Sequence, residues 1–219
     1  HNMLRVVQPK KASVGGTGGG VAILGRAQVR MDWCRIASNG MQFYADPGEF
    51  ERWLTGSGGG IGVREDAQAH FWNCTFSGNS SEFGYAIAGN GNRTTLDHCV
   101  VWGNFDAPDT EAPDLGPGNA VALAEVTNSI IYNNEFDPVR MPQLPDDPEI
   151  RYSIVQPTAD SLLGDNLIRN DPMFVDPSNG DFSTAEGSVA IAAADPVALG
   201  IDGQRTRIGL DPLARSAGM

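Results

Sequence analysis

The stretch GGGVAILGRAQVRMDWCRIASN at residues 18–39 returns 40 positions later as GGGIGVREDAQAHFWNCTFSGN at residues 58–79. The glycines, an Ala-Gln pair, a cysteine and a closing asparagine align without a gap, and most differing positions keep their apolar character. A repeat of this kind indicates one structural unit that is used more than once and packs against neighbouring copies of itself.

The end of this pattern recurs as HCVVWGN at residues 98–104, NSIIYNN at 128–134 and YSIVQP at 152–157. The small residue of the pattern recurs at spacings of 40, 25, 30 and 24 residues, so the frame is constant while the inserts vary. Three columns align: the small residues Cys34, Cys74, Cys99, Ser129 and Ser153, the apolar residues Ile36, Phe76, Val101, Ile131 and Val155, and the asparagines Asn39, Asn79, Asn104 and Asn134. The last copy has no asparagine.

Short strands are the predicted element of each copy, because apolar residues alternate with polar ones at Ala67, Ala69 and Phe71 and again at Cys74 and Phe76. Repeats of about 20–25 residues built from such strands fit the rungs of a parallel β-helix, stacked at about 4.8 Å. We expect the cysteines to be small buried residues rather than nucleophiles or metal ligands. We expect the asparagine column at the turns, where Asn tolerates left-handed backbone and forms an amide ladder along the stack.

The repeats resemble those of right-handed parallel β-helix proteins, especially the repeats of polymorphic outer-membrane proteins. A second stretch, NDPMFVDPSNGDFSTAEGSVAIAAADP at residues 170–196, is similar to the closing segment of bacterial pectin-lyase-like repeat proteins, although Val189 and Ala192 stand where Pro and Asp are usual. The resemblance implies an all-β chain, a right-handed parallel β-helix of about five to six rungs with long loops on one edge. It implies little about activity, because this fold carries unrelated functions.

Three regions are expected from these patterns. Residues 1–17 would be an N-terminal segment or partial rung, residues 18–169 the rungs with their edge loops, and residues 170–219 a closing rung and tail.

Composition excludes some classes of partner. The net charge of −12 opposes binding to nucleic acid or to an anionic membrane surface, which needs clustered Lys and Arg. No apolar run is long enough to span a membrane. The three cysteines cannot all pair with one another, and no Cys-x-x-Cys or zinc-like spacing occurs.

Long inserts follow the asparagine column, so we expect them to gather on one edge, where loops on a rigid scaffold commonly bind ligands. They span residues 40–57, 105–118, 135–149 and 157–169. Aromatic rings stack on the C–H faces of sugars and carboxylates accept hydrogen bonds from hydroxyls, so the inserts predict a carbohydrate site. The candidate binding residues are Tyr44, Trp53, Phe105, Asp106, Phe136 and Asp137. The alternative is that such residues only hold the loops against the stack.

No cofactor or metal is expected. The acidic runs at residues 109–114 and 146–149 offer oxygen ligands for Ca²⁺, but their prolines indicate turns and no EF-hand glycine is in place. The run from Asp176 to Asp181 looks like a metal loop, yet the resemblance to the closing segment makes it a structural turn.

Catalytic residues are not evident. The resemblance implies that a lyase would use an Arg or Lys base and acid-bound Ca²⁺, and the candidate bases Arg64, Arg93 and Arg140 are equally ordinary surface charges. Acids are too abundant for their spacing to identify a glycosidase pair. His70 and His98 fall in different columns of the repeat and are each expected on an outer face or a turn.

The sequence therefore predicts a secreted or surface β-helix protein of bacterial type. Its loop edge would bind a carbohydrate, such as a polysaccharide or cell-surface glycan, or present another ligand, without catalysis. The alternative is a polysaccharide lyase or glycosidase-like enzyme with its site among the edge loops. Another chain or domain is expected to stack on or cover the end rungs, because exposed strand edges pair readily.

Overall fold

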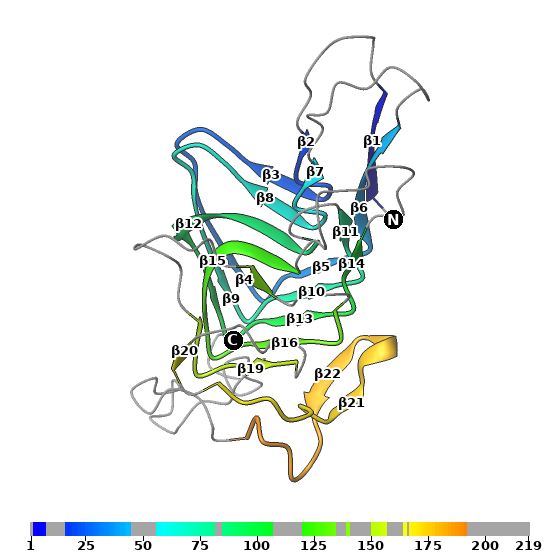
Figure 1. The fold of residues 1–219 in the computed structure, drawn as a ribbon, viewed down its shortest axis with the longest axis vertical. Helices are drawn as coiled ribbons and strands as arrows, with labels where there is room; N and C mark the ends of the chain where they lie inside the picture. Colours follow the sequence, from blue (N-terminus) through cyan, green and yellow to red (C-terminus); the bar gives the residue numbers. More distant parts are fainter. Residues whose placement is uncertain are drawn as a thin grey trace, which may run out of the picture.

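The computed structural model describes residues 2–7, 16–44, 56–81, 85–106, 120–134, 139–140, 150–156, 164–165 and 167–191. In these ranges the chain is all-β, and its one helical element is the 3₁₀ turn η1, Pro177–Asn179. Strands from successive copies of the repeat pair in parallel and form stacked sheets (Figure 1). This arrangement is compatible with a parallel β-solenoid and confirms the predicted all-β, parallel class.

Three larger sheets make up the stack. The five-stranded sheet follows the order β19 (Ile154–Val155), β16 (Ile130–Tyr132), β13 (Val100–Trp102), β10 (Thr75–Ser77) and β5 (Arg35–Ala37). The four-stranded sheet follows the order β1 (Asn2–Val7), β6 (Asn39–Tyr44), β11 (Ser80–Ser81) and β14 (Phe105–Asp106).

The nine-stranded sheet is the largest. Its main path runs through β20 (Gly164–Asp165), β18 (Ile150–Arg151), β15 (Val121–Thr127), β12 (Ile87–Asp97), β8 (Ile61–Val63) and β3 (Val21–Ile23). Off this path, β9 (Gln68–Trp72) pairs with β12 and with β4 (Gln28–Asp32), and β17 (Val139–Arg140) pairs with β15. A further parallel pair joins β2 (Gly16–Thr17) to β7 (Gly56–Ser57).

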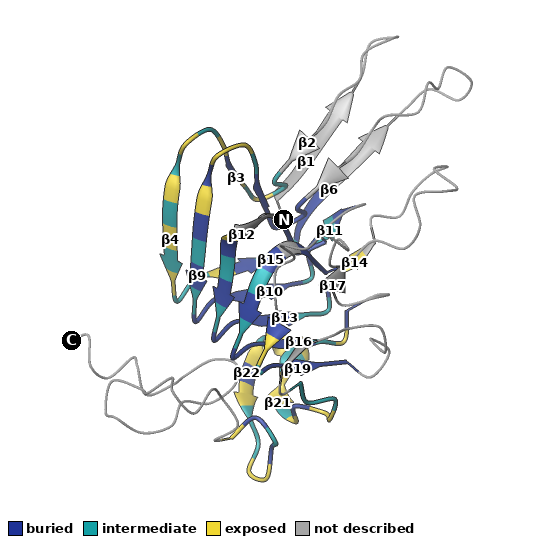
Figure 2. Ribbon diagram, turned by 60° about the vertical axis from the view of Figure 1, so that its left-hand side comes forward, coloured by how far each residue is buried: buried dark blue, intermediate teal, exposed yellow. Residues whose placement is uncertain are grey.

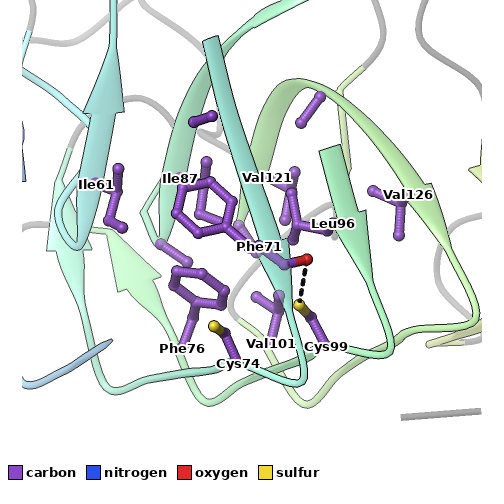
Figure 3. Packing of buried hydrophobic residues seen from close by; sticks show 14 of the residues in the cluster. Ile61, Phe71, Cys74, Phe76, Ile87, Leu96, Cys99, Val101, Val121 and Val126 are labelled. Atoms are coloured by element: carbon purple, nitrogen blue, oxygen red, sulfur yellow. Dashed lines mark hydrogen bonds between the residues drawn. The ribbon is translucent and has the colours of Figure 1, made fainter. Parts of the chain in front are cut away.

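The strand register follows the alignment of the copies. Phe76 is paired with Ile36 on one side and Val101 on the other, and the same column continues through Ile131 to Val155. These side chains point into the core, where Phe76 is fully buried and meets Phe71 edge-to-face at 5.4 Å between ring centroids (Figure 3). The predicted apolar column is confirmed.

The asparagine column forms the expected amide ladder. Asn79 Oδ1 accepts hydrogen bonds from the backbone N–H and the Nδ2 of Asn39, both at 3.1 Å. The same two bonds link Asn79 to Asn104, at 2.9 Å each, and Asn104 to Asn134, at 3.0 and 2.9 Å. Gln156, which the sequence analysis did not place in the ladder, is its last member, because its Oε1 accepts from the Asn134 backbone N–H at 3.0 Å.

Left-handed backbone does not lie in the asparagine column itself, so that part of the prediction is wrong. It lies one residue earlier, at Ser38, Gly78, Gly103 and Asn133, with φ between 54° and 61°. The residue before the Cys/Ser column is left-handed as well, in every copy: Trp33, Asn73, His98, Asn128 and Tyr152. The chain turns just before each ladder residue, which frees that residue's side chain to bond along the stack.

The repeated Gly-Gly-Gly sequence marks a place where neighbouring copies approach closely. Gly58 has a left-handed φ of 77°, and a Cβ on Gly59 would lie 2.3 Å from the carbonyl oxygen of Ser80 and 2.4 Å from that of Tyr85. No side chain fits there without moving backbone, so both copies need glycine.

The closing segment packs against the outside of the five-stranded sheet. Its antiparallel pair, β21 (Phe174–Asp176) and β22 (Asp181–Thr184), flanks η1. Asp176 caps η1 by accepting from Asn179, and Gly180 follows with φ 83°, so the run from Asp176 to Asp181 forms a turn, as predicted.

Candidate functional site

The closing segment covers part of the outer face of the five-stranded sheet. The outward residues Val100, Ile130 and Ile154 are fully buried and pack with Phe182 and Ala190 of that segment. The outer face of the nine-stranded sheet at β4, β9 and β12 differs, because its outward side chains are polar and partly exposed (Figure 2).

Strand β9 presents three outward side chains of different chemistry. Gln68 is exposed, and His70 and Trp72 are half-buried, while Ala69 and Phe71 between them are buried in the core. Because side chains alternate along a strand, Gln68, His70 and Trp72 form one row on the outer face. This row combines an amide, an imidazole and an indole.

The row adjoins a surface groove of about 580 Å³ that crosses strands β4, β9 and β12. Across the stack, His70 is paired with Arg30 on one side and with Thr95 on the other. The groove is lined by Gln28, Val29, Arg30, Gln68, Ala69, His70, Arg93 and Thr95.

Contacts within the face hold its polar side chains in place. His70 Nδ1 and Thr95 Oγ1 lie 2.5 Å apart. Arg30 Nε donates to both carboxylate oxygens of Asp32, at 2.9 and 2.8 Å. Arg93 Nη1 donates to Asp66 at 2.8 Å. Both arginines of the groove therefore already face a carboxylate, and the groove carries little unbalanced positive charge.

Trp72 extends this face beyond the groove. It meets Trp33 edge-to-face, with ring centroids 5.6 Å apart. Its strand neighbours in register are Asp32 and Asp97. A half-exposed indole beside carboxylates is suited to stacking on a sugar ring while acids accept its hydroxyl hydrogen bonds.

A polar cluster lies at the corner after β12. His98 is buried on a left-handed turn, which confirms its expected place on a turn but not on an outer face. Its Nδ1 lies 2.9 Å from Asp97 Oδ1, while Thr127 and Asn128 donate to the same oxygen at 3.2 and 3.0 Å. Burial alone raises the pKa of Asp97, but His98 and the two donors outweigh it and hold that pKa below its usual value.

The thiol column is structural. Cys34, Cys74 and Cys99 are free thiols, and the last two are fully buried. Cys99 Sγ donates to the carbonyl of Phe71 at 3.4 Å (Figure 3). Cys74 Sγ donates to the carbonyl of Met31 at 3.2 Å. Burial raises the pKa of Cys99 well above its usual value, which opposes formation of a nucleophilic thiolate. Both the predicted column and its inward position are confirmed.

The predicted edge site is only partly within the described residues. Trp53, Phe136 and Asp137 lie outside them. Three further candidates were predicted in loops: Tyr44, Phe105 and Asp106. They lie instead in strands of the four-stranded sheet, because parallel pairing continues past the asparagine corner. Phe105 is exposed and pairs with Ser80, and β11 lies between its strand and that of Tyr44. The strands of Tyr44 and Phe105 both flank β11 in one sheet, and the edge binding site stays a prediction.

The candidate bases lie in different parts of the chain. Of the candidate bases, Arg93 lines the groove, Arg64 follows β8, and Arg140 lies in β17. The acidic runs proposed as calcium ligands lie outside the described residues, and within the described part no group of three or more His, Cys, Asp or Glu side chains could hold a metal. No helix in that part could cross a membrane.

The outward row was missed, although its signal was present. The sequence analysis predicted Ala67, Ala69 and Phe71 as inward, and strand alternation then places Gln68, His70 and Trp72 outward. The binding site was predicted on the edge loops instead, because they are rich in acids and aromatics.

Comparison with known proteins adds no family assignment. No protein-family model matches the chain, and no curated protein is significantly similar to it. The function must therefore be argued from the residues of the face itself.

Proposed function

We propose that this protein binds a polysaccharide on the outer face of β4, β9 and β12, without cleaving it. The observation that carries the proposal is the outward row Gln68, His70 and Trp72 beside a groove of about 580 Å³. The amide and the imidazole can exchange hydrogen bonds with sugar hydroxyls, and the indole offers a flat apolar surface to a sugar ring.

The ligand in this proposal is an uncharged glycan. Arg30 and Arg93 each hold a carboxylate at 2.8 Å, and the chain as a whole carries a net charge of −12. A polyanion would be repelled by the whole molecule and would have to displace these carboxylates to reach the arginines.

The proposal treats the whole chain as a right-handed parallel β-helix of about five to six rungs that acts outside the cell or at its surface. Support comes from the in-register stacking of the repeat copies and from the closing segment. A stack suits an extended polymer, because positions recur at the interstrand spacing of about 4.8 Å.

The test measures binding of the full chain to a panel of neutral and acidic polysaccharides by calorimetry. We expect a neutral glycan to bind, and Trp72→Ala and His70→Ala each to weaken its binding by at least about tenfold, because each removes a direct contact. Thermal unfolding of each variant checks that the fold persists.

Phe105→Ala is the matched control, since Phe105 is an exposed aromatic of the originally predicted edge site. It should bind as the parent does. If Phe105→Ala loses binding while Trp72→Ala retains it, the edge is the site and the groove assignment is wrong. New reducing ends or unsaturated products would contradict the non-catalytic part of the proposal.

A further inference from the structure

One end of the stack exposes strand edges. Among the described residues, β4 and β5 each pair on one side only, with β9 and β10, and β3 pairs only with β8. We call the free sides of β3, β4 and β5 the open edge; β4 is the leftmost strand of Figure 2.

Core side chains are incompletely covered at this open edge. Val29, Met31 and Cys34 are only half-buried, whereas their partners in the next copy, Ala69, Phe71 and Cys74, are buried. Strands β9 and β10 cover Val29, Met31 and Cys34 from one side. A further layer with the same alternation of apolar and polar residues would cover them from the other side.

Backbone groups also point outward along the open edge. The carbonyl of Ala27 and the N–H of Trp33 bond toward β9, so the alternate residues Gln28, Arg30 and Asp32 direct their backbone groups to the free side. In β5, the carbonyl of Cys34 and the N–H of Ser38 bond toward β10, which directs Arg35 and Ala37 to the free side.

The opposite end of the stack has a partial last layer. Ile168 forms a parallel bridge with Ile154, its N–H bonds to the Ser153 carbonyl, and its carbonyl accepts from Val155. Leu167 packs against the core beside it. Among the described residues, β20 and Ile168 are the outermost members of the stack at that end.

Part of an additional layer is already in place above the open edge. Strand β1 pairs with β6 so that Asn2 lies opposite Asn39, the first member of the asparagine ladder. Strand β2 pairs with β7, and Gly16 lies opposite Gly56. These strands correspond to the part of a copy that follows its asparagine, and no described strand pairs with the free sides of β3, β4 and β5.

We propose that the open edge is a docking surface for one further copy of this repeat. The occupant is an extended segment with the alternating pattern of residues 66–79, running parallel to β4 and β5 and ending beside Asn2. It adds a strand layer through backbone hydrogen bonds, while its inward apolar residues cover Val29, Met31 and Cys34. This inference does not depend on glycan binding.

The test uses the full chain and a synthetic peptide with the sequence of residues 66–79 carrying Cys74→Ser. We expect saturable binding, a rise in melting temperature that grows with peptide concentration, and slower amide exchange at Gln28, Arg30, Arg35 and Ala37. A peptide of the same composition in scrambled order should do none of these.

A pair of variants at Ala37 tests the geometry. Ala37→Pro removes an N–H that points to the free side and should weaken peptide binding by at least about tenfold, whereas Ala37→Ser keeps that N–H and should bind as the parent does. If Ala37→Pro does not fold, amide protection in the parent still decides the question.

Absence of both stabilisation and protection up to the solubility limit of the peptide would overturn the proposal, as would equal binding of the scrambled peptide. Sedimentation of the parent alone is the last check. A dimer that protects the same amides would show that the occupant is a second copy of the chain, not a further repeat.

Discussion

At the scale of single residues, the asparagine ladder shows how one side chain serves two copies of the repeat. Asn134 Oδ1 accepts from Asn104, while its Nδ2 donates to the Val101 carbonyl at 3.0 Å. All these groups are buried, so each bond replaces one that water would otherwise supply. Gln156 can take the last place because its longer side chain compensates for a shorter interval, three residues after Ser153 instead of the five between Ser129 and Asn134.

Replacing Asn134 with alanine should therefore be costly. Asn134→Ala leaves the Asn104 backbone N–H, the Asn104 amide and the Val101 carbonyl without these bonds. We expect the free energy of unfolding to fall by about 3 kcal/mol, measured by urea denaturation.

The neighbouring Asn133→Gly is the control for this change. Asn133 is exposed and left-handed, and Gly78 and Gly103 hold the same position in other copies. The free energy of unfolding of Asn133→Gly should stay within about 0.5 kcal/mol of that of the parent. An equal loss in both variants would show that the ladder bonds are not the cause.

At the scale of elements, the closing segment explains why some strands are apolar on both faces. In β13, β16 and β19 the inward residue is preceded by an outward Val100, Ile130 or Ile154, whereas β5 and β10 have Arg35 and Thr75 there. Phe182 packs on the apolar positions and also meets Trp102 and Phe174, at 5.9 and 5.3 Å between ring centroids. The segment and the strands it covers thus form a second, smaller core.

Truncating Phe182 should loosen this second core. Phe182→Ala is expected to cost about 3–5 kcal/mol, because it leaves a cavity between the segment and the sheet. Limited proteolysis should then cut within residues 170–191 faster than in the parent. Phe105→Ala, which removes an exposed ring, should leave the proteolysis rate unchanged; similar rates for Phe182→Ala and the parent would contradict the proposed packing.

At the scale of the whole molecule, the chain carries a net charge of −12. Most carboxylates on such a surface are solvated and contribute little individually. Asp97 differs, because it is partly buried and accepts from Thr127 and Asn128 beside His98. Its lowered pKa links the protonation of one carboxylate to global stability.

The sign of this linkage follows from the direction of the shift. A carboxylate whose folded pKa lies below its unfolded value stabilises the fold above the unfolded pKa of about 3.9 and loses that contribution as pH falls through the folded pKa. We expect Asp97→Asn to be less stable than the parent by about 1 kcal/mol near neutral pH. The difference should disappear in strong acid.

Urea denaturation of both proteins across the acidic range checks this prediction. Asp66→Asn, which removes an exposed carboxylate paired with Arg93, should differ from the parent by less than Asp97→Asn does near neutral pH. A constant gap between Asp97→Asn and the parent down to the lowest pH would mean that protonation of Asp97 is not involved.

The sequence alone determined the repeat, the inward columns and the parallel stacking. These depend on local rules, since a period of two selects strands and the recurrence of Cys34, Ile36 and Asn39 in later copies sets the register between them. The inward column of cysteines could be predicted for the same reason, and Cys74 and Cys99 are buried whereas Cys34 is half-buried. The place of the left-handed residue could not, because the asparagine and the residue before it both suit a turn, and only the paired strands show which one turns.

Only the tertiary structure decided where a ligand could bind. The outer faces carry side chains that alternate with the core, and the sequence does not say which face the closing segment will cover. Phe182 packs on the five-stranded sheet, whereas the face with Gln68, His70 and Trp72 stays partly exposed. Tyr44 and Phe105 changed from predicted loop residues to strand residues because pairing between neighbouring copies extends past the turn. Such contacts join residues distant in sequence, and their energy depends on the assembled stack rather than on any local pattern.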